Sequence, residues 1–481
     1  MAVAMVAVAA IGLVTIARDA PLLWDEAVYS LRMRDVVGDE VRSGYWLEVR
    51  APGLPLLLTP VGLLFEIAEV PLRTTTLLMA VAGLALTWLI ARATIGPVPA
   101  VVAVWLLAIA PGWNESSWQV MPDISGATLA LGAVAVVLWA ARGDRLSWWA
   151  LAAAPLAGAA TLVRYGAPLL LGPAVLAAFL LQWETVRSSW RRSLVVLAST
   201  AAAAAVVWFV PAVTGASRPP VFVYAARQDL KAVPAATSAA DFASTLLELV
   251  GPVLGPLILV GSLVAVVLAV RGRGPRGPVA AFALIALSVL LLMLFGIAAY
   301  ELRYLTPALP FLAMLAAVGL VKAARWVTPR SAATLGAVVA VLGLGVAADT
   351  AVDRADEITR DFGPVRVAYR DIASVTAPPC VVLDNNPTAE WHTGCAALDP
   401  SPLWRLVQRE IPYAAAAPDE PVHAIVRDRA VAGGLVGDER ALVEALARRD
   451  VSSAPTVAAL DVGTVERVVA ELRARGLTDG G

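Results

Sequence analysis

Long, almost uncharged runs of Ala, Leu and Val recur along the chain up to residue 347, and they constrain the fold more than any other feature. The clearest runs are residues 74–91, 124–141, 194–213, 257–270, 278–299 and 331–347. Each approaches the ~20 residues that an α-helix needs to cross the hydrocarbon core of a bilayer. One such run could be a buried helix of a soluble protein, but a series of them indicates an α-helical polytopic membrane protein.

The composition supports this interpretation. Hydrophobic residues make up 59% of the 481 residues and charged residues 16%, against roughly 45–50% and about 25% in soluble proteins. A net charge of −1 gives no electrostatic footprint for nucleic acid. The first 17 residues have neither a basic n-region nor a small-residue cleavage site, so we interpret them as a retained first helix rather than a signal peptide.

The composition changes near Asp349, after which polar residues are spread throughout the chain. Strand patterns come first and amphipathic helix patterns follow: VVLDNN (381–386), VHAIVRD (422–428), ERALVEALARRD (439–450) and TVERVVAELRARG (464–476). We therefore expect a transmembrane module over residues 1–348 and a small α/β domain over residues 349–481.

Loops rich in Lys and Arg alternate with loops poor in them, and the basic loops mark the cytoplasmic face. The basic loops are residues 142–145, the segment with Arg187, Arg191 and Arg192, residues 271–277 and residues 322–330. The base-poor loops are residues 112–123, 164–166, 215–245 and 300–303.

Residues 53–69 decide the topology of the N-terminal end. This segment is barely long enough to cross and holds two prolines and two glutamates. Charge at membrane depth costs roughly 3 kcal/mol or more, whereas a helix lying at the interface leaves such residues in water. We therefore expect an interfacial helix after a first outer loop over residues 18–73, about 11 spans, an inside N-terminus and an extracytoplasmic C-terminal domain.

The few cysteines and histidines lie in the polar C-terminal part. Cys380 and Cys395 would sit in an oxidising compartment and could form a disulfide, although spacing alone leaves two unpaired thiols open. His392 and His423 stand in no Cys/His cluster of metal-binding spacing, so we expect ordinary surface residues.

Four polar motifs stand beside apolar runs. The first is WDEAVYS, where Asp25 and Glu26 follow Trp24 at a membrane boundary. The others are WNESSWQVMPDISG with Asp123, TLVRYGAP with Arg164, and YELRYLTPALPFL with Glu301, Arg303 and Tyr304. Each has a plain structural alternative: a helix cap for the acids, snorkelling for Arg164 and interfacial anchoring for the tyrosines. Under the expected topology the charged members lie at one membrane surface.

These motifs, in this order, resemble those of the membrane glycosyltransferases with the GT-C fold, in particular the protein O-mannosyltransferase and aminoarabinose-transferase group. WDEAVYS is similar to the acidic first-loop motif, RAPGLPLLL (50–58) to the basic-Pro-Pro stretch, and Arg73 to the arginine before the next helix. Asp123, Arg164 and ELRYLTPALPFL are similar to three later signatures. The resemblance covers about residues 1–345 and departs at Gly53, where the group has a second Pro.

The resemblance implies inverting transfer of a sugar from a polyprenyl- or dolichyl-phosphate donor to a hydroxyl on a protein, lipid or envelope glycan, at the outer face of the cell membrane. Asp25 would be the general base, with Glu26 beside it in the catalytic pair. Arg164 and Arg303 would bind the donor phosphate, and the acceptor and donor sugars would contact Asp123, Trp24, Tyr29, Glu301 and Tyr304. A divalent cation, Mg²⁺ or Mn²⁺, held by Asp25 and Asp123 stays open.

Three other interpretations compete with this one. A multispan transporter would place charges near the bilayer midplane and carry inverted repeats, whereas the notable charges here stand at the ends of apolar runs. A flippase or polymerase of lipid-linked sugars shares the lipid-phosphate chemistry and is harder to separate by sequence. A purely structural assembly protein leaves the acids and arginines unexplained.

Overall fold

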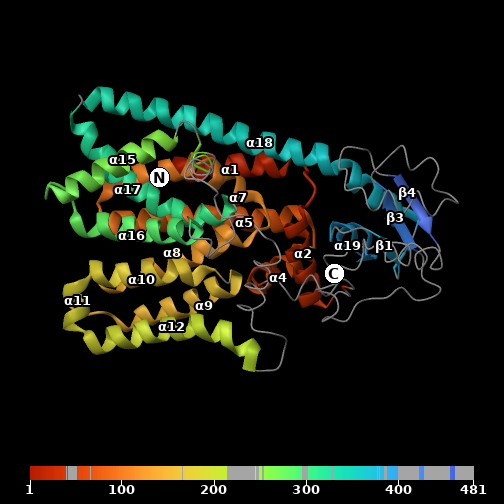
Figure 1. Cartoon of the computed structure of the whole chain (residues 1–481), viewed down its shortest axis with the longest axis horizontal. Coiled ribbons are helices and arrows are strands. Elements are labelled where there is room, and N and C mark those ends of the chain that lie inside the picture. The colour runs from red at the N-terminus through yellow and green to blue at the C-terminus, as the bar shows by residue number, and fades with distance from the viewer. Residues whose placement is uncertain are drawn as a thin grey trace. The chain divides into compact units, whose positions relative to one another are not determined.

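The computed structural model of the protein (Figure 1) is mainly α-helical, with a small β-sheet near the C-terminus. The chain divides by its internal contacts into two compact units. The first unit comprises Met1–Ala17, Ala51–Leu54 and Arg73–Asp353, and the second comprises Arg18–Arg50, Pro55–Leu72 and Arg354–Gly481. Apart from isolated positions, the structure describes residues 1–38, 51–65, 67–164, 166–213, 249–251, 254–294, 302–326, 329–375, 380–383, 387–398, 422–426 and 456–460.

The first unit is a bundle of apolar helices. In chain order they are α1 (Ala2–Ile16), α5 (Glu69–Thr94, from Arg73 on), α6 (Pro97–Ala108), α7 (Pro111–Trp118), α8 (Pro122–Ala140), η1 (Trp148–Ala152), α9 (Ala153–Val163), α10 (Ala167–Leu181), α11 (Trp183–Ser188), α12 (Trp190–Val213), α15 (Leu254–Val270), α16 (Arg276–Leu294), η2 (Leu302–Ala308), α17 (Leu309–Ala323), η3 (Ala324–Trp326) and the first part of α18 (Pro329–Val375). Figure 1 shows α9, α10 and α12 side by side.

Several of these helices can cross a membrane. Among the described residues, five helices are long and apolar enough to span a bilayer, or six if α6 and α7, which are bent by 64° at their junction, form one span. Other apolar helices, such as α1, α10 and α15, are shorter. The protein is therefore a multi-pass membrane protein, while the expected number of spans stays a prediction.

Small residues let α15 and α17 approach closely. A Cβ added at Gly261 of α15 would lie 2.7 Å from the carbonyl oxygen of Ala316, and one at Gly319 of α17 would overlap the Gly261 backbone. Contacts of this kind replace the hydrophobic effect as the source of helix association inside a bilayer, because lipid tails are as apolar as the side chains.

The basic loops of the first unit gather at one end of its helices. The Ser188 hydroxyl donates to the carbonyl of Asp144 at 2.8 Å, and the Leu146 N–H donates to the Ser189 hydroxyl at 2.8 Å. These bonds join the loop after α8 to the α11–α12 turn. The loop before α16 is nearby, since Gly277 lines one groove together with Gln182. Three of the four basic loops thus share one end.

The second unit begins with the helices around the first loop. They are α2 (Trp24–Val37), most of α4 (Gly53–Phe65) and the first residues of α5. Helix α4 has 13 residues, or ~20 Å of rise, which is shorter than the ~30 Å hydrocarbon core. That length agrees with the interfacial helix expected from residues 53–69.

The rest of the second unit is a small sheet beside the C-terminal part of α18. The strands β1 (Val381–Leu383), β2 (Ala396–Leu398), β3 (Val422–Val426) and β4 (Thr456–Leu460) lie in the order β2-β1-β3-β4. Strand β1 pairs in parallel with β2 and β3, and β4 is antiparallel to β3. Strands β1 and β3 lie within the two segments predicted as strands, whereas the predicted helices at 439–450 and 464–476 lie outside the described residues.

Apolar side chains hold this sheet against α18. Tyr369 and Ile372 of α18 form one buried cluster with Cys380, Val382 and Ala397 from the strands and their flanks. Helix α18 itself runs without a break through residue 349, where the composition of the sequence changes.

Candidate functional site

A buried ion pair joins two of the motifs picked out in the sequence. The Arg164 guanidinium binds a carboxylate oxygen of Asp123 through Nη1, with side-chain exposures of 15% and 2%. Asp123 lies in the first turn of α8, and Arg164 follows the last residue of α9. Helix N-termini favour negative charge and C-termini positive charge, so both helix ends stabilise the residue placed there.

The pair lies at the end of the first unit opposite the basic loops. Helix α8 runs from Asp123 to the basic loop at 142–145 over 19 residues, which is ~28 Å of rise. Helix α9 makes the return passage from η1 to Arg164. The separation is about one hydrocarbon thickness, which is the length expected of a helix that crosses a membrane.

Polar groups of α7 surround this end of the bundle. Trp113, Asn114 and Trp118 are buried, and the Asn114 amide donates to the carbonyls of Ala108 and Ala110 at 2.7 and 3.0 Å. Its oxygen, however, is one of several buried polar atoms with no hydrogen-bond partner among the described residues. The others near it are Trp113 Nε1, Trp118 Nε1, Ser125 Oγ and Thr306 Oγ1.

These atoms come from elements that pack on one another, because α7 contacts both α8 and η2, and α8 contacts η2. Buried polar groups in folded proteins almost always have a partner, either in the protein or in ordered water. Three elements that pack together at this end of the bundle therefore carry donors and acceptors that water or a polar ligand can bind.

Arg73 is also buried, and its guanidinium carbon lies 5.0 Å from the ring centroid of Trp118. The resemblance placed this arginine before a helix, and that expectation is wrong, since α5 begins at Glu69 and Arg73 lies inside it.

The departure from the family pattern at Gly53 has a structural reason. A Cβ there would overlap the backbone of Leu162 and Val163, so neither proline nor any other side chain fits at this position.

Asp25 and Glu26 lie on α2, in the second unit, and their environments differ. The cap of α2 is Leu23, whose N–H donates to the Glu26 carboxylate at 2.9 Å. Glu26 is fully buried and Asp25 is half-buried. The carboxylate that closes the helix start is therefore that of Glu26, and Asp25 is not the cap that the structural alternative required.

The remaining predicted residues are less fully defined. Trp24 and Tyr29 lie on α2 with the two acids, and Tyr29 is buried. Glu301 lies outside the described residues, as do the side chains of Arg303 and Tyr304, whose backbone forms part of η2. Because the acids of α2 and the Asp123–Arg164 pair belong to different units, a shared membrane surface for all of them stays a prediction.

In the described part of the chain, no three His, Cys, Asp or Glu side chains gather as metal ligands would. The Asp123 carboxylate binds Arg164 instead. Asp25 and Asp123, the residues expected to hold a divalent cation, belong to different units, so a metal site formed by both stays a prediction.

The sequence interpretation missed a second group of interacting side chains, which involves His392. This residue was expected at the surface, but its side chain is only 9% exposed. Burial, and then the charges of Arg366, Arg370 and Arg34, lower the pKa of His392 from 6.5 to about 3. Its ring stacks on Tyr369 with centroids 5.9 Å apart. The side chain of His423 lies outside the described residues.

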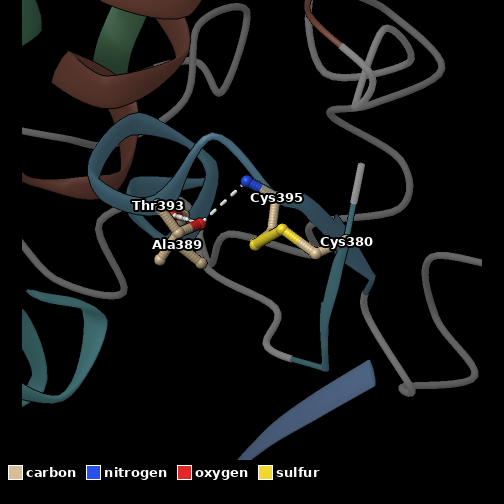
Figure 2. Close-up of a disulfide and its surroundings, with 4 residues drawn as sticks. All are labelled: Cys380, Ala389, Thr393 and Cys395. Carbon is tan, nitrogen blue, oxygen red and sulfur yellow. Dashed lines mark hydrogen bonds between the residues drawn. A yellow bond between two sulfur atoms is a disulfide. The ribbon is translucent and has the colours of Figure 1, made fainter. Parts of the chain in front are cut away.

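The two cysteines are joined in a disulfide, with Cα atoms 4.6 Å apart. Figure 2 shows the bond beside the turn that ends α19 (Thr388–Thr393). There the Cys395 N–H donates to the Thr393 hydroxyl at 2.9 Å, and that hydroxyl donates to the carbonyl of Ala389 at 2.6 Å. The WHTGC segment, which matched no catalytic motif, is thus a small cross-linked helix. The signal in the sequence that could have revealed this helix is Trp391, which stands just before Cys395, one of the two cysteines of the chain.

Comparison with known proteins agrees with the geometry. Residues 49–213 match the family model described as dolichyl-phosphate-mannose-protein mannosyltransferase. A sequence comparison with curated proteins finds no match.

Among solved structures, ArnT from Cupriavidus metallidurans bound to undecaprenyl phosphate is similar with a TM-score of 0.68 and 16% identity, over 96% of this chain and 98% of that chain. An oligosaccharyltransferase from Archaeoglobus fulgidus in complex with Zn and sulfate is similar with a TM-score of 0.53 and 14% identity, over 88% of this chain and 67% of that chain. The protein therefore has the fold of the GT-C membrane glycosyltransferase superfamily, and its residues 49–213 carry the sequence pattern of the mannosyltransferase model.

Proposed function

We propose that this protein is a membrane glycosyltransferase that moves one sugar from a polyprenyl- or dolichyl-phosphate donor to a hydroxyl acceptor at the extracytoplasmic face. The buried Asp123–Arg164 pair is the observation that carries the proposal. The pair lies about one membrane thickness from the basic loops, which by the charge rule face the cytoplasm. Neighbouring elements carry buried polar atoms that have no hydrogen-bond partner among the described residues.

An arginine at this place suits a lipid phosphate. A guanidinium carries five N–H donors in a fixed plane, so Arg164 can hold Asp123 and a phosphate oxygen together by charge-assisted bonds. Asp123 keeps the guanidinium in place while the ligand is absent. Similarity to an ArnT structure with bound undecaprenyl phosphate supports the same ligand class for this chain.

The proposed reaction inverts the anomeric carbon. Asp25 takes the proton of the acceptor hydroxyl, and the oxygen attacks the anomeric carbon of the sugar on the face opposite the phosphate. The bond between that carbon and the phosphate oxygen breaks, and both electrons leave with the lipid phosphate. Arg164 and Arg303 stabilise the charge that develops on the phosphate, a contribution that in other enzymes is about 3–4 kcal/mol for a single donor.

Asp25→Asn tests the assignment of the base. An amide cannot accept the proton at neutral pH, so we expect a fall in kcat of at least ~10²-fold, with unchanged expression and donor binding. Asp35→Asn, at the exposed end of the same helix, is the matched control and should stay near wild type. Transfer by Asp25→Asn at a normal rate would remove this residue from the role of base.

Deletion of the gene, followed by mass spectrometry of surface glycans, surface proteins and lipid-linked sugars, tests the function and identifies the sugar and the acceptor. A transferase should lose one sugar from an acceptor and accumulate a lipid-phosphate sugar. Purified protein in liposomes separates the alternatives. A transferase releases the polyprenyl phosphate and glycosylates the acceptor, whereas a flippase moves the intact donor across the bilayer and a polymerase lengthens a lipid-linked glycan.

A further inference from the structure

Trp391, in the short helix α19, connects to both ends of the segment expected as the first outer loop. The Arg34 guanidinium, in the last turn of α2, lies 3.9 Å above its ring centroid and also donates to its carbonyl oxygen at 3.1 Å. The indole N–H donates to Glu69 Oε1, in the first turn of α5, at 3.3 Å. All three residues belong to the second unit, so one side chain ties the end of α2 to the beginning of α5.

Helix α19 is itself held in place. The disulfide between Cys380 and Cys395 closes the segment on both sides of the helix, and Gly394 ends it in the left-handed conformation, with φ at 72° and a bond from its N–H to the Glu390 carbonyl at 2.9 Å. Glycine adopts this conformation without steric cost. The helix that carries Trp391 is thus held by a disulfide, drawn in Figure 2, and by the turn that ends it.

The contacts are more specific than anchoring the C-terminal part would require. An apolar patch would suffice for anchoring, whereas here Arg34 uses both its charge on the ring face and a hydrogen bond to the carbonyl. The neighbouring His392 Nε2 lies 3.8 Å from the same Glu69 oxygen, too far for a hydrogen bond. The hydrogen bond to Glu69 Oε1 therefore comes from the Trp391 indole N–H, and its direction fixes the orientation of the indole ring.

The same helix α2 carries Asp25 in its first turn, nine residues before Arg34, or ~14 Å along the axis. Glu26 secures the first turn, so the helix behaves as a rod from Asp25 to Arg34. A shift at its far end moves Asp25, and misplacing a reacting group by about 1 Å can cost ~10²-fold in rate.

We infer that Trp391 is a positioning residue for the transfer reaction: through Arg34 and Glu69 it fixes the orientation of α2, and through α2 that of Asp25. The inference rests on the proposed function, because the role of Asp25 as the base does. It assigns the C-terminal part of the chain, whose role the sequence analysis left open, an effect on the rate of the reaction through α2 and Asp25.

Kinetics of Trp391 variants test this role. Trp391→Ala should lower kcat by ~10–100-fold and change the donor KM by less than ~3-fold, since the donor site itself is not touched. Trp391→Phe keeps a ring under Arg34 and should recover most of the rate. Trp190→Ala, at an exposed tryptophan of α12, is the control. In an Asp25→Asn background, Trp391→Ala should cause no further loss, because the residue acts through Asp25.

Hydrogen exchange gives a second readout that does not need activity. In Trp391→Ala the amides of residues 24–37 should exchange faster, while those of α9 stay unchanged and the disulfide still forms, as thiol labelling would verify. Unchanged exchange over residues 24–37, or the same relative loss of rate with and without Asp25, would overturn the inference. If the wild-type protein transfers no sugar but Trp391→Ala still speeds exchange over residues 24–37, the proposed function and the positioning role both fail. The contact by which Trp391 stabilises α2 would then still stand.

Discussion

At the scale of single residues, the charged pair at the candidate site follows from the polarity of the two helix ends that carry it. Asp123 and Arg164 meet because the N-terminus of α8 favours an acid and the C-terminus of α9 a base. The absence of a Cβ at Gly126 helps, since one there would already lie 3.2 Å from the Cβ of Arg164. Charge of this kind is kept inside a protein only when each partner compensates the other.

Removing one partner of this pair should therefore destabilise the protein. Asp123→Asn removes the carboxylate charge that pairs with the largely buried Arg164 guanidinium, and we expect a loss of about 3–5 kcal/mol, seen as a lower midpoint of thermal unfolding in detergent. The double variant Asp123→Asn/Arg164→Gln should recover part of the loss, which a double-mutant cycle measures. Arg354→Gln, which breaks the exposed pair with Glu357, should cost below ~1 kcal/mol. Additive single losses would contradict the pairing.

His392 predicts how stability depends on pH. The unfolded chain takes up a proton as the pH falls below 6.5, whereas the folded chain holds the pKa of His392 at about 3. Protons therefore favour the unfolded state between these values. Stability should be full above pH 6.5 and decline as the pH falls toward 3. Unfolding midpoints measured from pH 7.5 to 4 should fall less in His392→Gln than in wild type, and equal declines would show that this histidine does not set the dependence.

At the scale of elements, the sequence predicted what depends on local pattern. The apolar runs gave the membrane helices, and alternation gave β1 and β3, because periodicity is encoded within a few neighbouring residues. The contacts of Trp391 with Arg34 and Glu69 could not be predicted from the sequence, because they join positions more than three hundred residues apart. Gly53 likewise looked like a departure from the family pattern until its closeness to the backbone of Leu162 and Val163 in α9 was known.

The disulfide should matter for α19 as an element. It closes a loop of 15 residues, a cross-link that contributes about 3 kcal/mol. In the Cys380→Ser/Cys395→Ser variant we expect a lower unfolding midpoint, faster exchange over residues 388–393 and a loss of transfer like that of Trp391→Ala. Reductant should reproduce these effects in wild type and change nothing further in the variant. Insensitivity of wild type to complete reduction would show that α19 holds its place without the bond.

At the scale of the whole molecule, the sequence resemblance ended near residue 345, but the fold of ArnT covers 96% of the chain and so extends into the C-terminal part. Fold similarity at 16% identity persists there because packing volume and polarity are conserved more easily than residue identity. Two properties of the whole chain, the number of spans and the face that carries the C-terminal part, are predictions from the apolar runs and the loop charges.

Topology mapping tests the predicted face of the C-terminal part. A reporter placed after residue 349 would interrupt α18, which continues to Val375, so it belongs after Gly481. We expect it outside the cytoplasm, as the alternation of basic and base-poor loops along the sequence predicts. A cysteine introduced by Arg273→Cys in the Cys380→Ser/Cys395→Ser background should react with an impermeant reagent only after the membrane is opened. A cytoplasmic reporter signal would place the C-terminal part, with its disulfide and the bond between Trp391 and Glu69, on the cytoplasmic side and would exclude extracytoplasmic transfer.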